Sequence, residues 1–333
     1  LRGIHADYLA AGADIILTCT FGGSRLKLPT GIDVTPFNRT MARIARAAVD
    51  AAGREAFVAG DMGPCGQFVR PLGDLPPLEL YEALREQARG LVEGGVDLFL
   101  IETQFDLAEV RIAVAAIRAE SDLPIMVSMT FEQGTSLTGT TPEIFAETMQ
   151  NLGVDALGLN CGLGPEQMAP LMERFLACSS VPVLAEPNAG LPETVEGQAV
   201  YHCPPEEFAS YAAGFAAAGV RIFGGCCGTT AEHVAALRAA VEAVDFSAFV
   251  PPRRDPDVIP CASEKEARFI TPDIDVGETI ECTSDLLEDI LEAEENAPQG
   301  ALKIAIYDED DLYTFAENQY AVKDALCLWT DVP

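Results

Sequence analysis

The sequence predicts an α/β protein whose main part is a (β/α)8 barrel of the TIM type. Short, continuously apolar runs alternate with segments of helical period through residues 1–245. Runs that are apolar throughout indicate strands covered on both faces, and strict alternation with helices indicates parallel strands joined by right-handed crossovers. Roughly 250 residues is the usual size of eight such units. The sequence lacks the glycine-rich fingerprint of the alternative, an open doubly wound sheet.

Seven apolar runs are the predicted strands of this barrel. They are DIILTCT (14–20), AFVAGDMG (56–63), DLFLIETQ (97–104), PIMVSMTF (124–131), DALGLNC (155–161), PVLAEPN (182–188) and RIFGGCC (221–227). The helical stretches between them include residues 76–95, 107–120, 142–153, 165–178 and 204–219. A further amphipathic helix, LRGIHADYLAAGAD, precedes the first run. Because that helix needs a strand before it, we expect the first barrel strand to lie ahead of the numbered sequence.

The character of the chain changes after residue 245. VPPRRDPDVIP (250–260) is rich in proline and predicts an extended linker. Residues 251–333 contain 21 acidic and 6 basic side chains, a net charge of −15. Beyond the linker, ARFITP, ALKIAI and DALCLWT resemble strands, and residues 284–296 and 311–320 resemble helices. We therefore expect a barrel over residues 1–249, a linker over 250–260, and a small acidic α/β appendage over 261–333.

The composition limits the partners and the compartment. The formal charge of −31, from 52 acidic and 21 basic residues, disfavours nucleic acid and anionic membranes as partners. The chain has no apolar run of membrane-spanning length and no visible secretory leader. Its ten cysteines are dispersed, as in cytoplasmic proteins with reduced thiols. In that compartment, clustered cysteines indicate a metal or catalysis before disulfides.

Three cysteines fall at predicted strand ends, where barrel enzymes carry their catalytic groups. Cys161 ends the fifth run, and Cys226 and Cys227 end the seventh. Three thiolates suit a zinc ion whose fourth position stays open, and the glycines around the pair permit a sharp turn. A redox pair is the alternative for Cys226 and Cys227. We expect the remaining seven to be small apolar residues: Cys19, Cys65, Cys178, Cys203, Cys261, Cys282 and Cys327.

An open zinc–thiolate site would bind an incoming thiol and keep it as a nucleophilic thiolate at neutral pH. This predicts alkyl transfer to a thiol. Glu102, at the end of the third run, is a candidate partner for the ammonium group of an aminothiol, or else makes a structural hydrogen bond or salt bridge. Asn188 would donate to the substrate or orient a loop. Further strand-end candidates for substrate contact are Thr18, Thr20 and Thr103.

Five motifs together resemble the homocysteine S-methyltransferase family over residues 1–245. They are YLAAGADIILTCTFGG (8–23), MTFEQGTSLTGTTPE (129–143), LNCGLGPE (159–166), AEPNAG (185–190) and GGCCGTTAEH (224–233). In most detail they resemble the homocysteine-binding module of cobalamin-dependent methionine synthase. The resemblance implies a (β/α)8 barrel and zinc held by Cys161, Cys226 and Cys227, with the homocysteine sulfur in the fourth position. It also implies that Glu102 contacts the substrate amino group and that Asn188 is the asparagine of the PNAG motif.

The sequence departs from this family in two places. The family's opening strand and its DG-x-MGT-like loop, which receives the substrate carboxylate, are not in the numbered sequence. Residues 251–333 carry no pterin signature and no cobalamin-binding D-x-H-x-x-G. The methyl donor therefore has no visible site in this chain, and the resemblance implies that the donor is methylcobalamin carried by another domain or by a corrinoid protein.

The expected function is zinc-dependent methyl transfer to homocysteine, giving methionine. No general base is needed once the metal has deprotonated the thiol. S-methylmethionine or betaine is the alternative donor. Two other classes stay open: a non-catalytic zinc- or aminothiol-binding module, and an open-sheet redox protein that uses the cysteine pair.

Overall fold

The computed structural model describes residues 1–195, 197–246, 249–255, 257–262, 267–271, 273, 276–296, 301–322 and 325–330. Of these, the side chains of residues 259–262, 267, 268, 296, 320, 325 and 327–329 lie outside the description. The expectation for Cys261 and Cys327 therefore falls outside it as well. The chain divides into two compact units, Leu1–Pro252 and Arg253–Pro333. Within the described residues, no helix is both long and apolar enough to cross a membrane.

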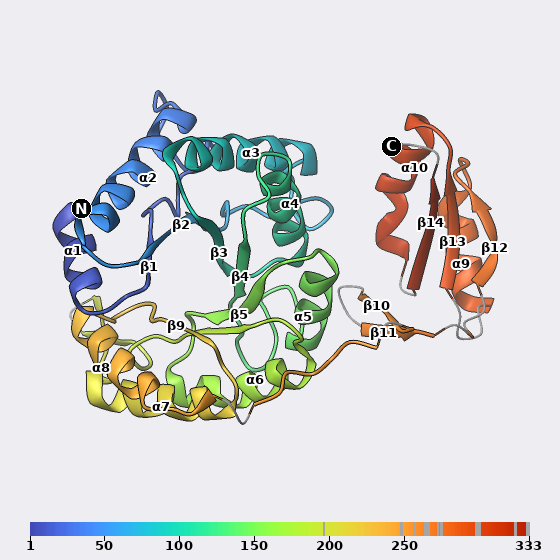
Figure 1. Ribbon diagram of the computed structural model, residues 1–333. Helices are drawn as coiled ribbons and strands as arrows, with labels where there is room; N and C mark the ends of the chain where they lie inside the picture. The colour runs from blue at the N-terminus through green and yellow to red at the C-terminus, as the bar shows by residue number, and fades with distance from the viewer. Residues whose placement is uncertain are drawn as a thin grey trace. The chain divides into compact units, whose positions relative to one another are not determined.

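The first unit is built around a curled parallel sheet (Figure 1). In the described part of the chain, seven strands follow one another in the order β1-β2-β3-β4-β5-β6-β9. They are β1 (Ile15–Leu17), β2 (Phe57–Met62), β3 (Leu98–Gln104), β4 (Ile125–Met129), β5 (Ala156–Asn160), β6 (Val183–Glu186) and β9 (Ile222–Phe223). Each strand lies within the apolar run that predicted it. The α/β class and the parallel sheet are thus confirmed.

Helices surround this sheet on its outer side (Figure 1). They are α1 (Arg2–Ala10), α2 (Val34–Ala51), α3 (Pro77–Gly94), α4 (Leu107–Arg118), α5 (Pro142–Asn151), α6 (Pro165–Cys178), α7 (Pro205–Ala218) and α8 (Ala231–Glu242). Helices α3, α5, α6 and α7 carry proline in the first turn, where its missing N–H leaves no helical hydrogen bond unmade. Gly95 ends α3 with a φ of 87°, a left-handed conformation that glycine adopts readily.

The inside of the curled sheet is filled by alternate residues of the strands. This interior cluster consists of Ala59, Leu98, Leu100, Met126, Ala156 and Leu184, with Ile15, Leu17 and Ile222 packed against it. The intervening residues point outward to the helices. Beyond β4, for example, Phe131 stacks edge-to-face on Phe145 of α5 and Phe175 of α6, with ring centroids 6.1 and 5.6 Å away. The alternation determines which residues at the carboxyl ends of the strands point inward.

Strands β1 and β9 are the two edges of the sheet, and they are not hydrogen-bonded to each other. The flanking helices nevertheless meet. The Tyr8 hydroxyl of α1 donates to the carbonyl of Thr229 at 3.4 Å, and Arg238 of α8 forms an ion pair with Asp14. The predicted first strand has no counterpart among the described residues. What the structure contains is therefore a curled, open parallel sheet with the organisation of a TIM-like barrel.

A short hairpin is inserted between β6 and α7. Its strands are β7 (Glu193–Val195) and β8 (Gln198–Val200), paired antiparallel. The hairpin was not predicted, because its residues are largely exposed and carry no alternation of apolar and polar side chains. The hairpin leads into Tyr201, whose ring lies against Gly228 of the loop after β9.

The second unit contains a three-stranded parallel sheet of β12 (Val276–Glu281), β13 (Ala301–Ile306) and β14 (Ala325–Thr330). Its helices are α9 (Leu286–Asn296) and α10 (Glu309–Asn318), followed by the 3-10 turn η2 (Gln319–Ala321). Leu286 and Ile290 of α9 pack on Leu302, Ile304 and Ile306 of β13. An antiparallel pair, β10 (Ile259–Ala262) and β11 (Ala267–Ile270), precedes this sheet.

Two strands of this unit were not predicted. Strand β12 is an edge strand whose sequence, VGETIE, is mostly exposed and polar, so it lacks the pattern of a buried strand. Strand β10 begins at Ile259, inside the segment predicted as an extended linker. An extended, proline-containing segment can pair as an edge strand, and proline content alone does not separate the two outcomes.

Candidate active site

A layer of polar side chains covers the apolar interior at the carboxyl ends of the strands. Each member lies two or four residues beyond a residue of the interior cluster on the same strand. Residues two apart on a strand point to the same face, so the layer points into the curled sheet. It consists of Asp61 of β2, Glu102 of β3, Ser128 of β4, Asn160 of β5 and Glu186 of β6.

Three thiols gather at the edge of this layer. Cys161 directly follows β5, and Cys226 and Cys227 follow β9. Their sulfur atoms lie within 4.8 Å of one another, with Cys161 Sγ and Cys227 Sγ 3.8 Å apart. All three are free thiols. The convergence expected from the strand ends is therefore present, because only β6 separates β5 from β9 in the sheet.

The backbone at Cys161 is in a conformation that side chains rarely adopt. Its φ is 59°, and its N–H donates to the carbonyl of Glu186 at 3.1 Å, which holds the residue at the end of the β5–β6 ladder. Non-glycine residues with positive φ in the described chain are Cys19, Thr103, Gln133 and Cys161. All four lie at the carboxyl ends of strands or just beyond them. Such strain collects at functional sites, where the surrounding structure enforces it.

The loop that carries Cys226 and Cys227 is closely packed. The N–H of Cys226 donates to the carbonyl of Pro187 at 2.9 Å, which ties the loop to the end of β6. A Cβ at Gly224 would lie 2.7 Å from the carboxyl oxygen of Glu186. Of the three flanking glycines, Gly228 alone has a positive φ, 82°. The glycines thus allow the loop backbone to lie close to neighbouring side chains, and they also allow the sharp turn predicted from the sequence.

Asn188 links the two cysteine-bearing loops. Its side chain is 3 % exposed, and its Oδ1 accepts the N–H of Cys227 at 3.0 Å. Its own N–H donates to the carbonyl of Leu163, two residues beyond Cys161, at 2.9 Å. The orienting role considered in the sequence analysis is therefore visible in the structure. A direct contact between Asn188 and a substrate stays a prediction.

Glu102 lies next to the thiols and is held by hydrogen bonds. Its Oε2 accepts the side-chain amide of Asn160 at 3.1 Å and the hydroxyl of Thr103 at 3.3 Å. The backbone N–H of Thr103 donates to Asn160 Oδ1 at 2.9 Å, which closes a small network. Burial raises the pKa of Glu102 above its usual range. Thr103 thus supports Glu102, and its contact with a substrate stays a prediction.

Asp61 is a member of this site, and the sequence had indicated only its place at a strand end, without a role. Its carboxyl group is 3 % exposed and hydrogen-bonded to that of Glu102. Burial, and then the charge of Glu102, raise the pKa of Asp61 well above its usual value. Asp61 Oδ1 has no hydrogen-bond partner in the described structure. Asp61 stands two residues beyond Ala59 of the interior cluster and so points to the same face of β2. This spacing was the signal that could have identified it.

Thr18 and Thr20 join the carboxyl ends of β1 and β2. Both are almost completely buried, and their hydroxyls lie 2.6 Å apart. Thr20 donates to the carbonyl of Asp61 at 2.7 Å, and Thr18 accepts the N–H of Asp61 at 3.0 Å. The two threonines therefore fasten β1 to β2 and position Asp61. Their hydroxyls are engaged with protein atoms, and a substrate contact stays a prediction.

The thiols differ in acidity. Cys161 accepts a hydrogen bond from Cys226, and chiefly for this reason the pKa of Cys161 is lowered to about 5. The same bond, together with burial, raises the pKa of Cys226. Burial and the negative charge of Cys161 raise the pKa of Cys227. The cluster thus favours the thiolate form of Cys161 over that of Cys226 or Cys227.

The donor set fits a zinc ion. Among the described residues, Cys161, Cys226 and Cys227 form the one group of three or more histidine, cysteine or carboxylate side chains close enough to share a metal. Three sulfur donors favour zinc over magnesium or calcium, which prefer oxygen. No histidine competes for the role. His202 pairs with Glu193, and His233 caps α8 through Thr230.

The remaining described cysteines show the expected apolar burial only in part. Cys65 is buried, and Cys178, Cys203 and Cys282 are half-buried. The expectation was wrong for Cys19, which is exposed, with a positive φ at the end of β1. Its position in the alternation of β1 matches that of Leu17, so it faces the open end of the interior rather than the helices.

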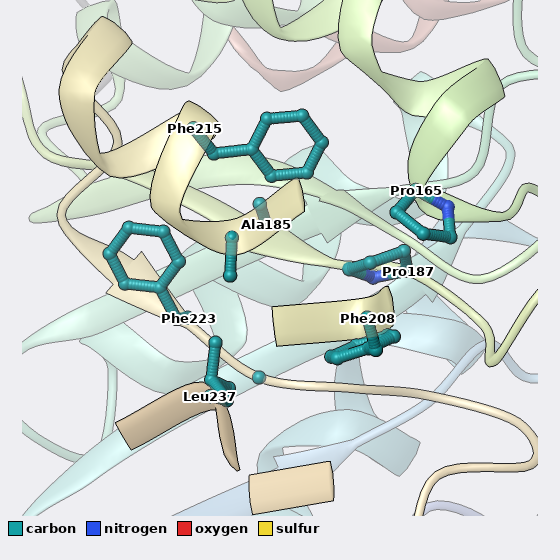
Figure 2. A pocket seen from close by; sticks show the side chains of 9 residues that line it. Pro165, Ala185, Pro187, Phe208, Phe215, Phe223 and Leu237 are labelled. Atoms are coloured by element: carbon teal, nitrogen blue, oxygen red, sulfur yellow. The ribbon is translucent and has the colours of Figure 1, made fainter. Parts of the chain in front are cut away.

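A small cavity lies between the sheet and its outer helices, and Gly224 is among the residues that line it (Figure 2). Its volume is about 10 Å³, and apolar side chains of β6, β9, α7 and α8 surround it, among them Phe208, Phe215, Phe223 and Leu237. A space of this size barely admits one water molecule, and an apolar lining leaves it dry. The cavity is a packing gap between sheet and helices, and it contributes no polar group to the site.

Comparison with known proteins identifies similar sequences. A model of the homocysteine S-methyltransferase family matches residues 1–241. Methionine synthase of Mycobacterium tuberculosis (strain ATCC 25618 / H37Rv) is 36 % identical over 255 residues, which are 72 % of this chain and 21 % of that protein. The chain thus spans about a fifth of the length of this curated relative.

Solved structures show the same fold at lower identity. The metallated form of the homocysteine methyltransferase MmuM from Escherichia coli superposes with a TM-score of 0.61 and 24 % identity, over 72 % of this chain and 83 % of that one. The apo form of the same protein gives a TM-score of 0.58 and 25 % identity, over 72 % and 84 %. The likeness supports the TIM-like organisation of the first unit.

Proposed function

The chain belongs to the homocysteine S-methyltransferase family, and from this premise we propose that it transfers a methyl group to the thiol of homocysteine, giving methionine. The observation that carries the proposal is the position of three free thiols beside two carboxyl groups, the buried Asp61 and the half-buried Glu102. The thiols are chemically suited to hold the metal that activates a substrate thiol. The carboxyl groups are suited to receive its ammonium group.

Cys161, Cys226 and Cys227 would hold zinc. Zinc bound there would supply Lewis acidity, which lowers the pKa of a substrate thiol and keeps it a thiolate at neutral pH. Asn188 and the backbone bonds of the two loops hold the sulfur atoms in position. Outer contacts of this kind strongly affect the affinity and reactivity of a metal site.

Glu102 and Asp61 would bind the ammonium group of homocysteine. Their carboxyl oxygens offer hydrogen-bond acceptors to that group, among them the unpartnered Asp61 Oδ1. Thr103 and Asn160 keep Glu102 oriented while it binds. An ammonium at this place would leave the sulfur end of the substrate free to reach the thiol cluster.

Methyl transfer would be an in-line displacement. The substrate thiolate attacks the methyl carbon, a new carbon–sulfur bond forms, and the electron pair of the donor–methyl bond leaves with the donor. The proton of the thiol passes to solvent beforehand, so the protein needs no general base at the moment of transfer. The residues contribute by holding the thiolate in line and by reducing the loss of freedom in the transition state.

The methyl donor that we propose is methylcobalamin, carried by another domain or by a corrinoid protein. The relationship to methionine synthase supports this choice, since the chain spans about a fifth of that protein. S-methylmethionine and betaine are the alternative donors. The reduced thiols in the site fit a cytoplasmic protein.

We also propose that an eighth strand completes the sheet to a (β/α)8 barrel between β9 and β1. The two edges face no partner in the described structure, although helices α1 and α8 already meet across them. In this arrangement residues 1–249 form the barrel, residues 250–260 the linker and residues 261–333 a small α/β appendage.

A panel of methyl donors tests the function. Zinc-loaded protein and homocysteine would be incubated with methylcobalamin, S-methylmethionine or betaine, and methionine would be measured. One donor should give methionine, and a Cys226→Ser variant should abolish it. Homocysteine binding by calorimetry without methionine from any donor would contradict methyl transfer by this chain and would favour the non-catalytic aminothiol-binding module.

A further inference from the structure

Asn160, at the carboxyl end of β5, is completely buried, and both polar atoms of its side chain are hydrogen-bonded. Its Oδ1 accepts the backbone N–H of Thr103 and the hydroxyl of Ser128, each at 2.9 Å. Its Nδ2 donates to the hydroxyl of Thr103 at 2.8 Å and to Glu102 Oε2 at 3.1 Å. Because a backbone N–H can only donate, the amide atom that faces it is the oxygen, and this determines the orientation of the amide.

Asn160 holds an irregular point of β3. The ladder between β3 and β4 changes register between Ile101 and Gln104, so the strand is irregular at Glu102 and Thr103. Thr103 has a φ of 58°, which a β-branched residue rarely adopts. The two bonds between Thr103 and the amide of Asn160 hold this conformation. Irregularities of this kind aim a side chain next to a site, so Asn160 helps to determine where the adjacent Glu102 points.

The same side chain reaches the thiol cluster. Asn160 Nδ2 lies 3.9 Å from Cys226 Sγ, and Cys161 is the next residue of the chain. Asn160 is therefore in contact with the carboxyl group of Glu102 and with a sulfur atom of the cluster. In the proposed function, the carboxyl group receives the ammonium end of the substrate, and the cluster holds the metal that binds its sulfur end.

We propose that Asn160 is a positioning residue that sets the distance between Glu102 and the thiol cluster, and so selects homocysteine against cysteine, which is one methylene shorter. The proposal rests on the proposed function, because it takes from it the two ends of the substrate. An amide bonded at both atoms keeps the carboxyl group from moving toward the cluster to meet a shorter substrate. Side chains locked by such bonds hold a site to the geometry of one ligand.

The test compares the dissociation constants of homocysteine and cysteine, measured by calorimetry on zinc-loaded protein. One missing methylene usually costs about 10–200-fold in selectivity, so the parent protein should prefer homocysteine by about that much. In Asn160→Ala the ratio of the two constants should fall about tenfold, because the change releases Glu102 and the backbone of Thr103. A loss of affinity that affects both thiols alike cancels in this ratio, so the ratio reports on substrate length.

Asn38→Ala is the matched control. Asn38 of α2 is as completely buried as Asn160, and its Nδ2 donates to two backbone carbonyls at 2.7 and 2.8 Å. Its loss should lower stability but keep the ratio of the parent protein. If Asn160→Ala does not fold, Asn160→Asp takes its place, since it keeps the shape and the acceptor for Thr103 but has no N–H to donate to Glu102. Elemental analysis should find the same zinc content in every variant and in the parent protein.

The outcomes separate the possible failures. The parent ratio maintained in the Asn160 variant, or a ratio that falls equally in Asn38→Ala, overturns the role of Asn160 in selecting substrate length. Zinc lost from the Asn160 variant alone assigns the residue to metal binding and also overturns that role. A parent protein that binds both thiols equally overturns length selection and leaves the proposed function intact. A parent protein that takes up no zinc, or that binds neither thiol when loaded, overturns the proposed function itself.

Discussion

The side-chain oxygen of Asn188 accepts the backbone N–H of Cys227 at 3.0 Å, across 39 residues of sequence. This bond joins the loop after β6 to the loop after β9. The backbone of Asn188 is in turn bonded to Leu163, in the loop after β5. One buried asparagine therefore keeps both cysteine-bearing loops in register, and the thiol cluster depends on it.

We expect Asn188→Ala to weaken metal binding far more than it weakens the fold. The change leaves the Cys227 N–H without its acceptor, at a cost of about 1–3 kcal/mol in the free energy of unfolding. Loss of an orienting partner typically lowers metal affinity about 10–100-fold. Zinc affinity would be measured by competition with a chromophoric chelator. The exposed Asn151→Ala serves as control, and equal affinities in the two variants would contradict the orienting role.

The sequence was sufficient to predict the strands and the convergence of the cysteines. Buried parallel strands are continuously apolar, so their positions could be predicted from the apolar runs. Cys161, Cys226 and Cys227 lie where those strands end. Glu102 was found by the same reasoning. These inferences needed only the order of strands in a parallel sheet, which their strict alternation with helices determines.

What the sequence did not reveal depends on side-chain direction or on irregular segments. Asp61 and Glu186 are an even number of positions from a residue of the interior cluster, so they point into the curled sheet. Thr18 and Thr20 are an even number of positions from Ile16, which lies on the opposite face of β1. Counting positions along each strand would have separated the two groups. Tyr201 stands after an exposed hairpin without periodicity, so no local pattern could place it beside Cys227.

Cys226→Ser should lower bound zinc from about one ion per chain to substoichiometric levels. Removing one of three sulfur donors from a site with no nearby histidine leaves no replacement ligand of comparable softness. Zinc would be counted by elemental analysis after gel filtration under reducing conditions. Cys282→Ser, in the second unit, is the control and should keep its zinc. Full occupancy in Cys226→Ser would refute the proposed ligand set.

Glu102→Gln should raise the KM for homocysteine about 100-fold with a much smaller change in kcat, which corresponds to about 2.7 kcal/mol of lost ammonium binding. The amide keeps the shape and the hydrogen bonds but not the charge. A thiol acid without the amino group should be used equally well by both forms. If Glu102→Gln discriminates between the two substrates as strongly as the parent does, the ammonium contact is wrong.

Because the pKa of Glu186 is raised, the free energy of unfolding should change with pH in a definite direction. Burial, and then the charge of Glu102, raise the pKa of Glu186 to about 8. Between its usual value and about pH 8 the folded protein keeps a proton that the unfolded chain has lost. The free energy of unfolding therefore falls as pH rises through this window, by at most about 1.4 kcal/mol per pH unit. Above about pH 8 both states have lost the proton, so the free energy of unfolding stays lower by the whole amount.

The comparison of parent protein with Glu186→Gln isolates this contribution. Cys161, whose pKa is lowered, acts in the opposite direction, so the difference between the two proteins is the informative quantity. In metal-free protein the variant should match the parent near pH 5 and exceed it by a few kcal/mol near pH 8. Urea unfolding at both pH values measures this. A difference independent of pH would contradict the neutral, buried Glu186.

Gly228 and Gly53 offer a matched pair for the contact with Tyr201. Both have a positive φ, 82° and 69°, but a Cβ at Gly53 meets nothing within 4 Å, whereas one at Gly228 lies 2.4 Å from the Tyr201 ring. We expect Gly53→Ala to cost about 1 kcal/mol of unfolding free energy from backbone strain alone. Gly228→Ala should cost about 1–3 kcal/mol more, the usual range for overpacking.

A double-mutant cycle attributes the excess to the tyrosine. In a Tyr201→Ala background the ring is gone, so Gly228→Ala should cost only the strain that Gly53→Ala shows. The coupling energy between positions 228 and 201 should then be about 1–3 kcal/mol, in the range measured for residues in direct contact. Additive effects at the two positions would mean that the ring does not rest on the cysteine loop.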